Sequence, residues 1–257
     1  MSFLFDEIIF GPVNSRRLGV SLGINLLPTD SKFCNFNCVY CECGWTKNKE
    51  QGKINFPSRK MVFDALEHRL STEFQDNSLD VITYAGNGEP TIHPEFSGVI
   101  EDTIFLRNKY VPQAKIAVLS NATMIFKENI VNALKTIDMN ILKLDSAIDE
   151  TMQKINQPLQ KLTVDKVVEN MRKFEGKLIV QTLFFKGNYN HVFVDNTTEK
   201  EIDTWVRKIE IIKPESVMVY TIARDTPEPG LDKLSINDLE KIADKLRKLG
   251  IDVQVSG

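Results

Sequence analysis

The feature that most constrains the fold of this chain is a repeated alternation of short apolar runs with amphipathic segments. The apolar runs are almost continuously hydrophobic and rich in β-branched residues, which is typical of parallel strands buried on both faces. These runs predict strands at residues 20–27, 81–85, 116–119, 141–144, 178–184 and 217–222, with a short last strand at 253–255.

The amphipathic segments between the runs predict helices. The clearest covers residues 235–249, where Ser235 is a good N-cap, apolar residues recur at helical spacing and Gly250 follows as a C-terminal cap. Residues 164–174, closed by Gly176, repeat this design. Weaker helices are predicted at residues 58–74, 95–109, 126–137 and 199–212.

Strands that alternate with helices form a parallel sheet covered by helices. Six or seven such units are too few to close an eight-stranded barrel. The pattern therefore predicts an α/β fold, a partial, open parallel (β/α)6 barrel of the TIM type, as one core domain over residues 1–257. Chemistry in such folds takes place at the C-terminal ends of the strands, so motifs that directly follow a strand are the functional candidates.

Composition and charge exclude several classes of protein. Hydrophobic residues make up 42% and charged residues 26% of the chain, which are ordinary globular values. The formal net charge of −3 gives no general support to nucleic-acid binding. The first ten residues carry Asp6 and Glu7 but no basic residue, and no apolar run approaches the ~18 residues of a membrane span. We therefore expect a soluble, cytoplasmic protein without a membrane partner.

All four cysteines of the chain lie within ten residues, in a loop expected at 29–45 after the first strand. A disulfide framework would spread its cysteines to join distant segments, so this clustering favours a metal site. Cys34, Cys38 and Cys41 have the spacing C-x3-C-x2-C. Three thiolates on one short loop can bind three irons of a 4Fe–4S cubane and leave the fourth iron open to a small molecule.

The alternative for the same loop is a zinc site completed by Cys43 or a histidine. The three histidines, His68, His93 and His191, do not have the spacing to the cysteines that zinc knuckles show. Cys43 follows Cys41 by only two residues and would have to double back to join the same tetrahedron. These spacings weigh against zinc, and we expect Cys43 to be a bystander thiol.

A glycine-rich turn, Gly86-Asn87-Gly88-Glu89, follows the predicted strand 81–85 directly. Glycine lets the backbone approach a ligand closely, and Glu89 adds a carboxylate beside that backbone. A ligand that bears an ammonium group would suit this pairing. Such turns are common in proteins, so the motif gains weight only from its place after a strand and after the cysteine loop.

Together the two motifs resemble a known family. The cysteine spacing, with Tyr40 before the last cysteine, is similar to the signature of the radical S-adenosylmethionine (SAM) superfamily, and residues 86–90 resemble its glycine-rich motif with Asn87 in place of one glycine. The chain looks closest to stand-alone wyosine-synthase-like iron–sulfur oxidoreductases. True archaeal wyosine synthases carry a second cluster on additional N-terminal cysteines, which this chain lacks.

The resemblance implies cofactors and site residues. Cys34, Cys38 and Cys41 would hold a 4Fe–4S cluster whose open iron chelates SAM, Tyr40 would contact adenine, and Gly86–Glu89 would hold the methionine part. Reduction by an external one-electron donor of the flavodoxin or ferredoxin type would cleave SAM to methionine and a 5′-deoxyadenosyl radical, which abstracts hydrogen from a substrate.

Polar residues at later strand ends are further candidates for cofactor binding. Asn121, Asp145 and Ser146 would suit ribose hydroxyls or would cap the following helices. Arg224 would pair with a carboxylate of SAM or substrate, or form a surface ion pair. Residues with a weaker case are Arg16 and Arg17 (an anion site or solvated), Lys143, Gln181 and Thr182 (facing the barrel interior), and His93 (near the site or shaping its turn).

Three functions fit these residues. The first is a radical SAM enzyme acting on a nucleoside, an RNA base or another small anionic substrate, although the net charge does not support RNA. The second is an activase that places a radical on a partner protein. The third is a non-catalytic iron–sulfur or electron-transfer module, which would not bind SAM.

Overall fold

The computed structural model describes residues 3–46, 54–74, 78–223, 226 and 229–257. Its main sheet has eight strands, in the order β1 (Ile9–Ser15), β2 (Gly19–Ile24), β3 (Val81–Tyr84), β4 (Lys115–Ser120), β5 (Met139–Lys143), β6 (Ile179–Leu183), β9 (Ser216–Tyr220) and β11 (Val253–Ser256). From β2 to β11 all neighbouring strands are parallel, and β1 pairs antiparallel with β2.

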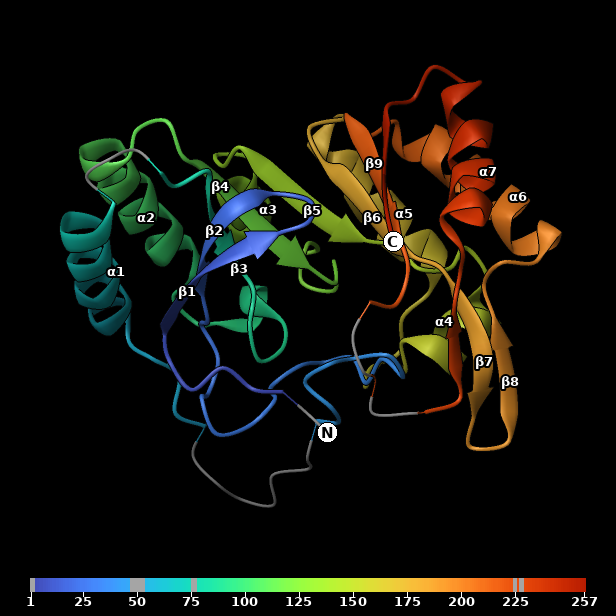
Figure 1. The fold of residues 1–257 in the computed structure, drawn as a ribbon, viewed down its shortest axis with the longest axis horizontal. Coiled ribbons are helices and arrows are strands. Elements are labelled where there is room, and N and C mark those ends of the chain that lie inside the picture. Colours follow the sequence, from blue (N-terminus) through green and yellow to red (C-terminus); the bar gives the residue numbers. More distant parts are fainter. Residues whose placement is uncertain (1–2, 47–53, 75–77, 224–225, 227–228) are drawn as a thin grey trace.

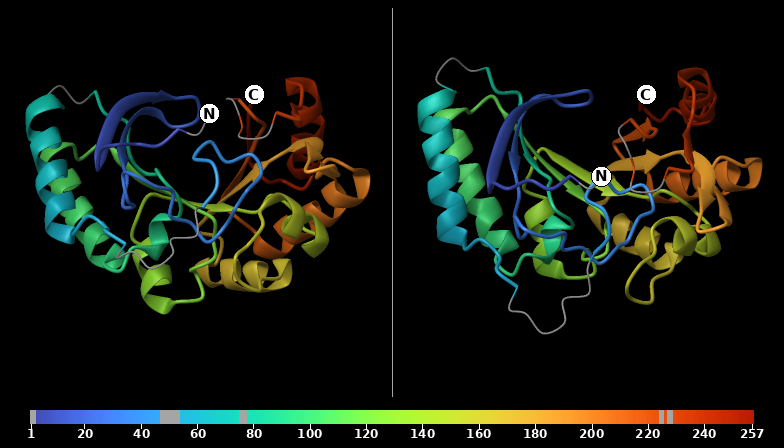
Figure 2. Two further views of the ribbon diagram at one scale, coloured as in Figure 1. Left: turned by 90° about the horizontal axis from the view of Figure 1, so that it is seen from below. Right: turned by 60° about the horizontal axis from the view of Figure 1, so that its bottom comes forward.

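Helices cover the outer face of this curved sheet, and the sheet stays open between its two edges (Figures 1 and 2). The helices are α1 (Arg59–Glu73), α2 (Phe96–Tyr110), α3 (Glu128–Leu134), α4 (Asp149–Ile155), α5 (Val164–Met171), α6 (Glu199–Ile212) and α7 (Ile236–Arg247), with short 3-10 helices η1 (Pro90–Ile92) and η2 (Arg172–Phe174). The predicted open (β/α) barrel is confirmed. Every predicted strand and helix is present, with boundaries shifted by a few residues.

Four strands and one helix were not predicted. β1 contains Gly11, Pro12 and Asn14, which disfavour central strands but are tolerated at the edge position that β1 occupies. A second, three-stranded sheet has the order β10 (Leu231–Lys233), β7 (Phe185–Tyr189) and β8 (Val192–Asp195). The helix α4 spans seven residues, too few for an amphipathic pattern to stand out.

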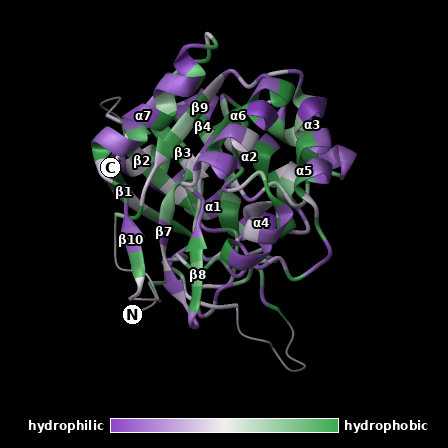
Figure 3. Ribbon diagram, turned by 90° about the vertical axis from the view of Figure 1, so that its right-hand side faces the viewer, coloured by the Kyte–Doolittle hydropathy of each residue, from purple (hydrophilic) through white to green (hydrophobic). Residues whose placement is uncertain are grey.

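Local caps explain where several helices begin. The side chains of Ser58, Thr163, Thr198 and Ser235 each accept a hydrogen bond from a backbone N–H in the first turn of α1, α5, α6 and α7, respectively. Gly250 follows α7 with φ +79°, as a C-terminal glycine should. Figure 3 shows the helices with both hydrophilic and hydrophobic residues, as expected when one side of each packs on the sheet.

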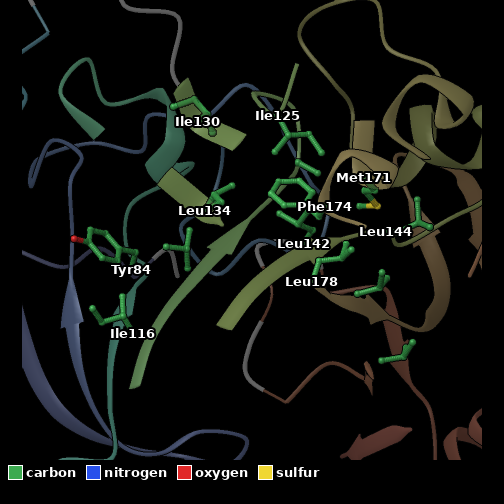
Figure 4. Close-up of a cluster of buried hydrophobic side chains, with 14 of the residues drawn as sticks. Tyr84, Ile116, Ile125, Ile130, Leu134, Leu142, Leu144, Met171, Phe174 and Leu178 are labelled. Atoms are coloured by element: carbon green, nitrogen blue, oxygen red, sulfur yellow. The ribbon is translucent and has the colours of Figure 1, made fainter. Parts of the chain in front are cut away.

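The main core lies between the outer face of the sheet and the helices. In Figure 4, Leu142 of β5 lies beside Phe174 of η2, and Ile116 of β4 lies beside Tyr84 of β3. Alternate strand residues point inward instead, and at one end of the barrel they form an apolar floor. The floor residues are Val81, Ala117, Ile141, Ile179 and Met218. Within the described residues no helix is long and apolar enough to cross a membrane.

Candidate active site

A cavity of about 290 Å³ lies at the C-terminal ends of the parallel strands, where the fold predicts chemistry. Its walls come from the cysteine loop, the turn after β3 and the ends of β4, β5, β6 and β9. Eight residues predicted to bind the cluster or SAM line it: Cys34, Cys38, Tyr40, Cys41, Gly86, Gly88, Glu89 and Asn121.

The cysteine loop is attached to the fold by its backbone. The N–H of Phe33 donates to the Asn87 carbonyl (2.7 Å), and the N–H of Glu89 donates to the Phe33 carbonyl (3.2 Å). Farther along, the N–H of Val39 donates to the Ile155 carbonyl at the end of α4 (2.9 Å). These bonds hold the loop between the glycine-rich turn and α4, so the three thiols face the same cavity.

The thiols differ in their electrostatic surroundings. Burial raises the pKa of Cys34 to about 12 and also raises the pKa of Cys38. A hydrogen bond from Cys43 lowers the pKa of Cys41 to about 5, so Cys41 carries the readiest thiolate. The sulfur of Cys43 also lies 3.4 Å from the Gly86 carbonyl oxygen.

The donor set of the cavity consists of three thiols from one loop. Among the described residues, no group of three or more His, Cys, Asp or Glu side chains is gathered closely enough to hold one metal ion. A 4Fe–4S cluster divides its ligands among separate irons, so it needs sulfurs that border a common space rather than meet at one point. The cavity provides that arrangement.

A buried lysine, not predicted from the sequence, accompanies the thiols. Lys32 is 5% exposed, and its ammonium donates to the Gly44 carbonyl (2.7 Å). Burial opposes its charge, but the nearby sulfurs, Cys41 foremost, outweigh burial and raise the pKa of Lys32. The sequence feature that could have identified Lys32 is its position two residues before the first cysteine, where a cation would offset the negative charge of the thiolates.

Close packing explains the glycine at position 88. A Cβ atom on Gly88 would collide with the Phe33 carbonyl oxygen, and its φ of +142° suits glycine only. Glycine therefore lets the turn lie directly against the cysteine loop.

Glu89, in the same turn, is buried with its carboxylate held from several sides. Its Oε1 accepts hydrogen bonds from Thr91 N–H, Thr91 Oγ and Ser120 Oγ, and its Oε2 accepts one from the N–H of Asn121 (2.6 Å). Since a carboxylate oxygen can accept more than one hydrogen bond, Oε2 retains capacity for a ligand ammonium group. Burial raises the pKa of Glu89, and a ligand cation would favour its ionised form.

Asn87 does not enter the cavity, contrary to its predicted contact with the cofactor. Its Nδ2 donates to the carbonyls of Phe5 (2.8 Å) and Pro28 (2.9 Å), and its Oδ1 accepts from the N–H of Phe5 (2.8 Å). The side chain instead ties the N-terminal segment to the turn, and only the backbone of residue 87 serves the site.

Tyr40 lines the cavity, but its hydroxyl is committed to a buried network. It donates to Oδ2 of Asp145 and accepts from Nζ of Lys143 (2.7 Å). Asn156 Nδ2 donates to the same Asp145 oxygen (2.7 Å) and lies 3.4 Å from the sulfur of Cys38. Burial keeps the pKa of Tyr40 well above its usual range, so the phenol remains a donor.

The carboxylate of Asp145 makes its hydrogen bonds within the chain, and its contact with ribose stays a prediction. Its Oδ1 accepts from the N–H of Leu183 (3.1 Å), and its Oδ2 is occupied by the network with Tyr40. Asn156 was not identified from the sequence, because 118 positions separate it from Cys38 and no local pattern marks it.

Of the remaining predicted residues, some enter the site and others do not. Asn121 points into the site, where its Nδ2 lies 3.6 Å from the sulfur of Cys34. Ser146 does not line the cavity; it accepts a hydrogen bond from the N–H of Ile148 (3.0 Å), the residue before α4, and α4 has no side-chain cap. His93 shapes the turn, with Nε2 2.8 Å from the Pro57 carbonyl. Arg224 lies outside the described residues.

Residues 29–209, more than half of the chain, match the family model of the radical SAM superfamily. The UPF0026 protein MJ1312 of Methanocaldococcus jannaschii is 32% identical over 239 residues, which are 91% of this chain and 70% of that protein.

Solved radical SAM structures share the fold. A radical SAM methyltransferase from Sphaerobacter thermophilus aligns with a TM-score of 0.66 and 13% identity, over 92% of this chain and 65% of that chain. SuiB from Streptococcus suis, bound to SAM, aligns with a TM-score of 0.62 and 16% identity, over 88% of this chain and 49% of that chain. The family match, the relative and the shared barrel agree with the site geometry: this chain belongs to the radical SAM superfamily.

Proposed function

We propose that Cys34, Cys38 and Cys41 hold a 4Fe–4S cluster and that the chain is a SAM-cleaving enzyme. The observation that carries this proposal is that these three cysteines, the glycine-rich turn and Glu89 line one cavity at the C-terminal ends of the strands. When bound, the cluster supplies the electron that splits SAM into methionine and a 5′-deoxyadenosyl radical, which takes hydrogen from the substrate.

The protein itself binds SAM and orients it beside the cluster. The backbone of Gly86 and Gly88 lets the methionine portion approach closely, and the free capacity of Glu89 Oε2 receives its ammonium group. Tyr40 forms part of the wall, with Asp145 and Asn156 fixing its ring. The cavity side chains exclude water from the reacting groups.

A donor and a substrate complete the proposal. An external flavodoxin- or ferredoxin-type protein would supply the electron, and a nucleoside, an RNA base or another small anionic molecule would supply the hydrogen. Activation of a partner protein is the alternative within the same chemistry.

The test measures iron content and 5′-deoxyadenosine in anaerobically reconstituted protein with dithionite and SAM. We expect Cys34→Ala and Cys38→Ala to lose the cluster and all product, because each removes a ligand. Cys43→Ala is the control, because it removes a neighbouring thiol that lies outside the C-x3-C-x2-C spacing, and it should keep most of its iron. Equal iron in the wild type and the Cys34 variant would overturn the ligand assignment, and a loaded protein that neither binds nor cleaves SAM would support an electron-transfer module.

A further inference from the structure

The inside of the barrel changes character above its apolar floor. The next inward-facing positions on β5, β6 and β9 carry Lys143, Gln181 and Tyr220, which all line the active-site cavity. Gln181 is 7% exposed, and within the described part of the chain its Nε2 has no hydrogen-bond partner. A buried amide donor without a partner in a cavity wall indicates a ligand that accepts from it.

A second unpartnered donor comes from the opposite side of the cavity. The turn between β1 and β2 reaches across the open side of the barrel, where Gln254 Nε2 of β11 donates to the Arg17 carbonyl (3.4 Å). The guanidinium of Arg17 lies over the ring of Tyr220, 4.4 Å from its centroid. Its Nη1 is buried and has no hydrogen-bond partner among the residues that the structure describes.

The other charged groups of the wall, Glu42 among them, are already engaged. Lys143 pairs with Asp145 (3.4 Å) and Tyr40, and Lys32 donates to the Gly44 carbonyl. Glu89 accepts four hydrogen bonds from Thr91, Ser120 and Asn121. Arg16, beside Arg17, is exposed and donates to the Gly257 carbonyl (2.6 Å). Arg17 therefore differs from these cations in presenting a buried N–H that nothing in the described chain accepts.

We propose that Arg17 and Gln181, with Tyr220 as the platform beneath the guanidinium, bind an anionic oxygen group of the substrate, a carboxylate or a phosphate. The guanidinium supplies charge and parallel N–H donors, and the amide supplies a third donor. This site rests on the proposed function for its meaning as a substrate site, although anion binding by these residues can be measured without turnover.

The position of Arg17 leaves room for the rest of such a substrate. Arg17 also borders a second cavity of about 890 Å³, which shares Cys43 and Gly86 with the first and extends to Phe5 and Phe10. A substrate anchored at Arg17 would therefore lie beside the proposed SAM site while its remaining atoms occupy the larger space.

The experiment titrates inorganic phosphate and, separately, acetate into reconstituted protein that is saturated with SAM and kept without reductant. Saturation with SAM fills the open iron and the methionine site, so neither anion can bind there. We expect saturable binding to the wild type, a loss of at least tenfold in Arg17→Met and Gln181→Leu, and partial recovery in Arg17→Lys. The anion that binds more tightly identifies the substrate group.

Arg16→Met is the matched control, because it removes the same charge from the neighbouring position, and it should change anion affinity less than threefold. Equal losses in the Arg16 and Arg17 variants would indicate a diffuse positive field and overturn the site. A fall in SAM affinity in Arg17→Met as large as the fall in anion affinity would assign Arg17 to the SAM carboxylate and also overturn it. If the protein binds these anions but never cleaves SAM, the proposed function fails while the anion site stands.

Discussion

At the scale of single residues, the site combines groups that the sequence marks with groups that it does not. The cysteines and glycines form a local motif whose spacing is visible in the sequence. Lys32 and Asn156 complete the surroundings of the sulfurs from a loop and from the end of a helix. Residues that contact the metal ligands orient these ligands and adjust their electronic properties, so Lys32 and Asn156 belong to the function of the site.

Lys32 should set the reduction potential of the cluster. We expect Lys32→Met to lower that potential by about 50–150 mV, because a buried cation a few ångströms away stabilises the added electron. Lys32→Arg keeps the charge and should remain near the wild-type value. A potentiometric titration followed by electron paramagnetic resonance measures the difference, and identical potentials in the Met and Arg variants would refute this role.

At the scale of elements, the turn after β3 organises the site from behind. His93 ends η1, where its Nδ1 accepts from the N–H of Glu95 (3.1 Å) and its Nε2 donates to the Pro57 carbonyl (2.8 Å). This pattern requires the neutral imidazole, because a proton on Nδ1 would remove an acceptor. The buried ring thus joins the segment before α1 to the turn that carries Glu89.

This arrangement predicts a pH dependence of stability. Burial lowers the pKa of His93 below its ordinary 6.5, so the unfolded chain binds a proton that the folded chain resists. Its contribution is present above pH 6.5 and is lost as pH falls below that value. We expect His93→Gln to reduce the fall in thermal midpoint between pH 6.5 and 5, measured anaerobically. The exposed His68→Gln variant should follow the wild type, and an unchanged slope in His93→Gln would contradict this account.

At the scale of the whole molecule, the turn of the β1–β2 hairpin reaches across the open side of the barrel. Leu18 in its turn packs against the apolar floor, and Arg16 and Arg17 contact β11 and the C-terminal residue through hydrogen bonds. The hairpin thereby connects the first strands to the last, 237 positions apart in sequence.

Removing the Leu18 side chain should weaken this closure. We expect Leu18→Ala to lower the free energy of unfolding by about 1–2 kcal/mol, less than a fully buried leucine, because Leu18 is only partly buried. Leu249→Ala, at an exposed leucine, should cost less than about 0.5 kcal/mol. Denaturant unfolding under anaerobic conditions compares the two, and equal losses would show that the hairpin contact adds no stability.

The sequence by itself determined the barrel and the motif residues, because both depend on local patterns. Buried parallel strands must be apolar, helices between them must be amphipathic, and a cluster loop must space its cysteines closely. The sequence could not distinguish the orientations of Asp145 and Ser146, because they are adjacent residues after one strand and have opposite orientations. The edge strand β1 also lacked a signal, since its pairing rather than its composition defines it.

Only the tertiary structure decided which polar groups are used up and which remain available. The side chains of Asn87 and Asp145 find partners within the chain, whereas Arg17 Nη1 and Gln181 Nε2 find none among the described residues. The physical reason is that hydrogen-bond satisfaction depends on atoms brought together from distant segments, and 164 positions separate Arg17 from Gln181. The residues of the cofactor site can thus be recognised from local sequence motifs. The proposed substrate site depends on the tertiary structure, because its residues come from the β1–β2 hairpin, β6 and β9.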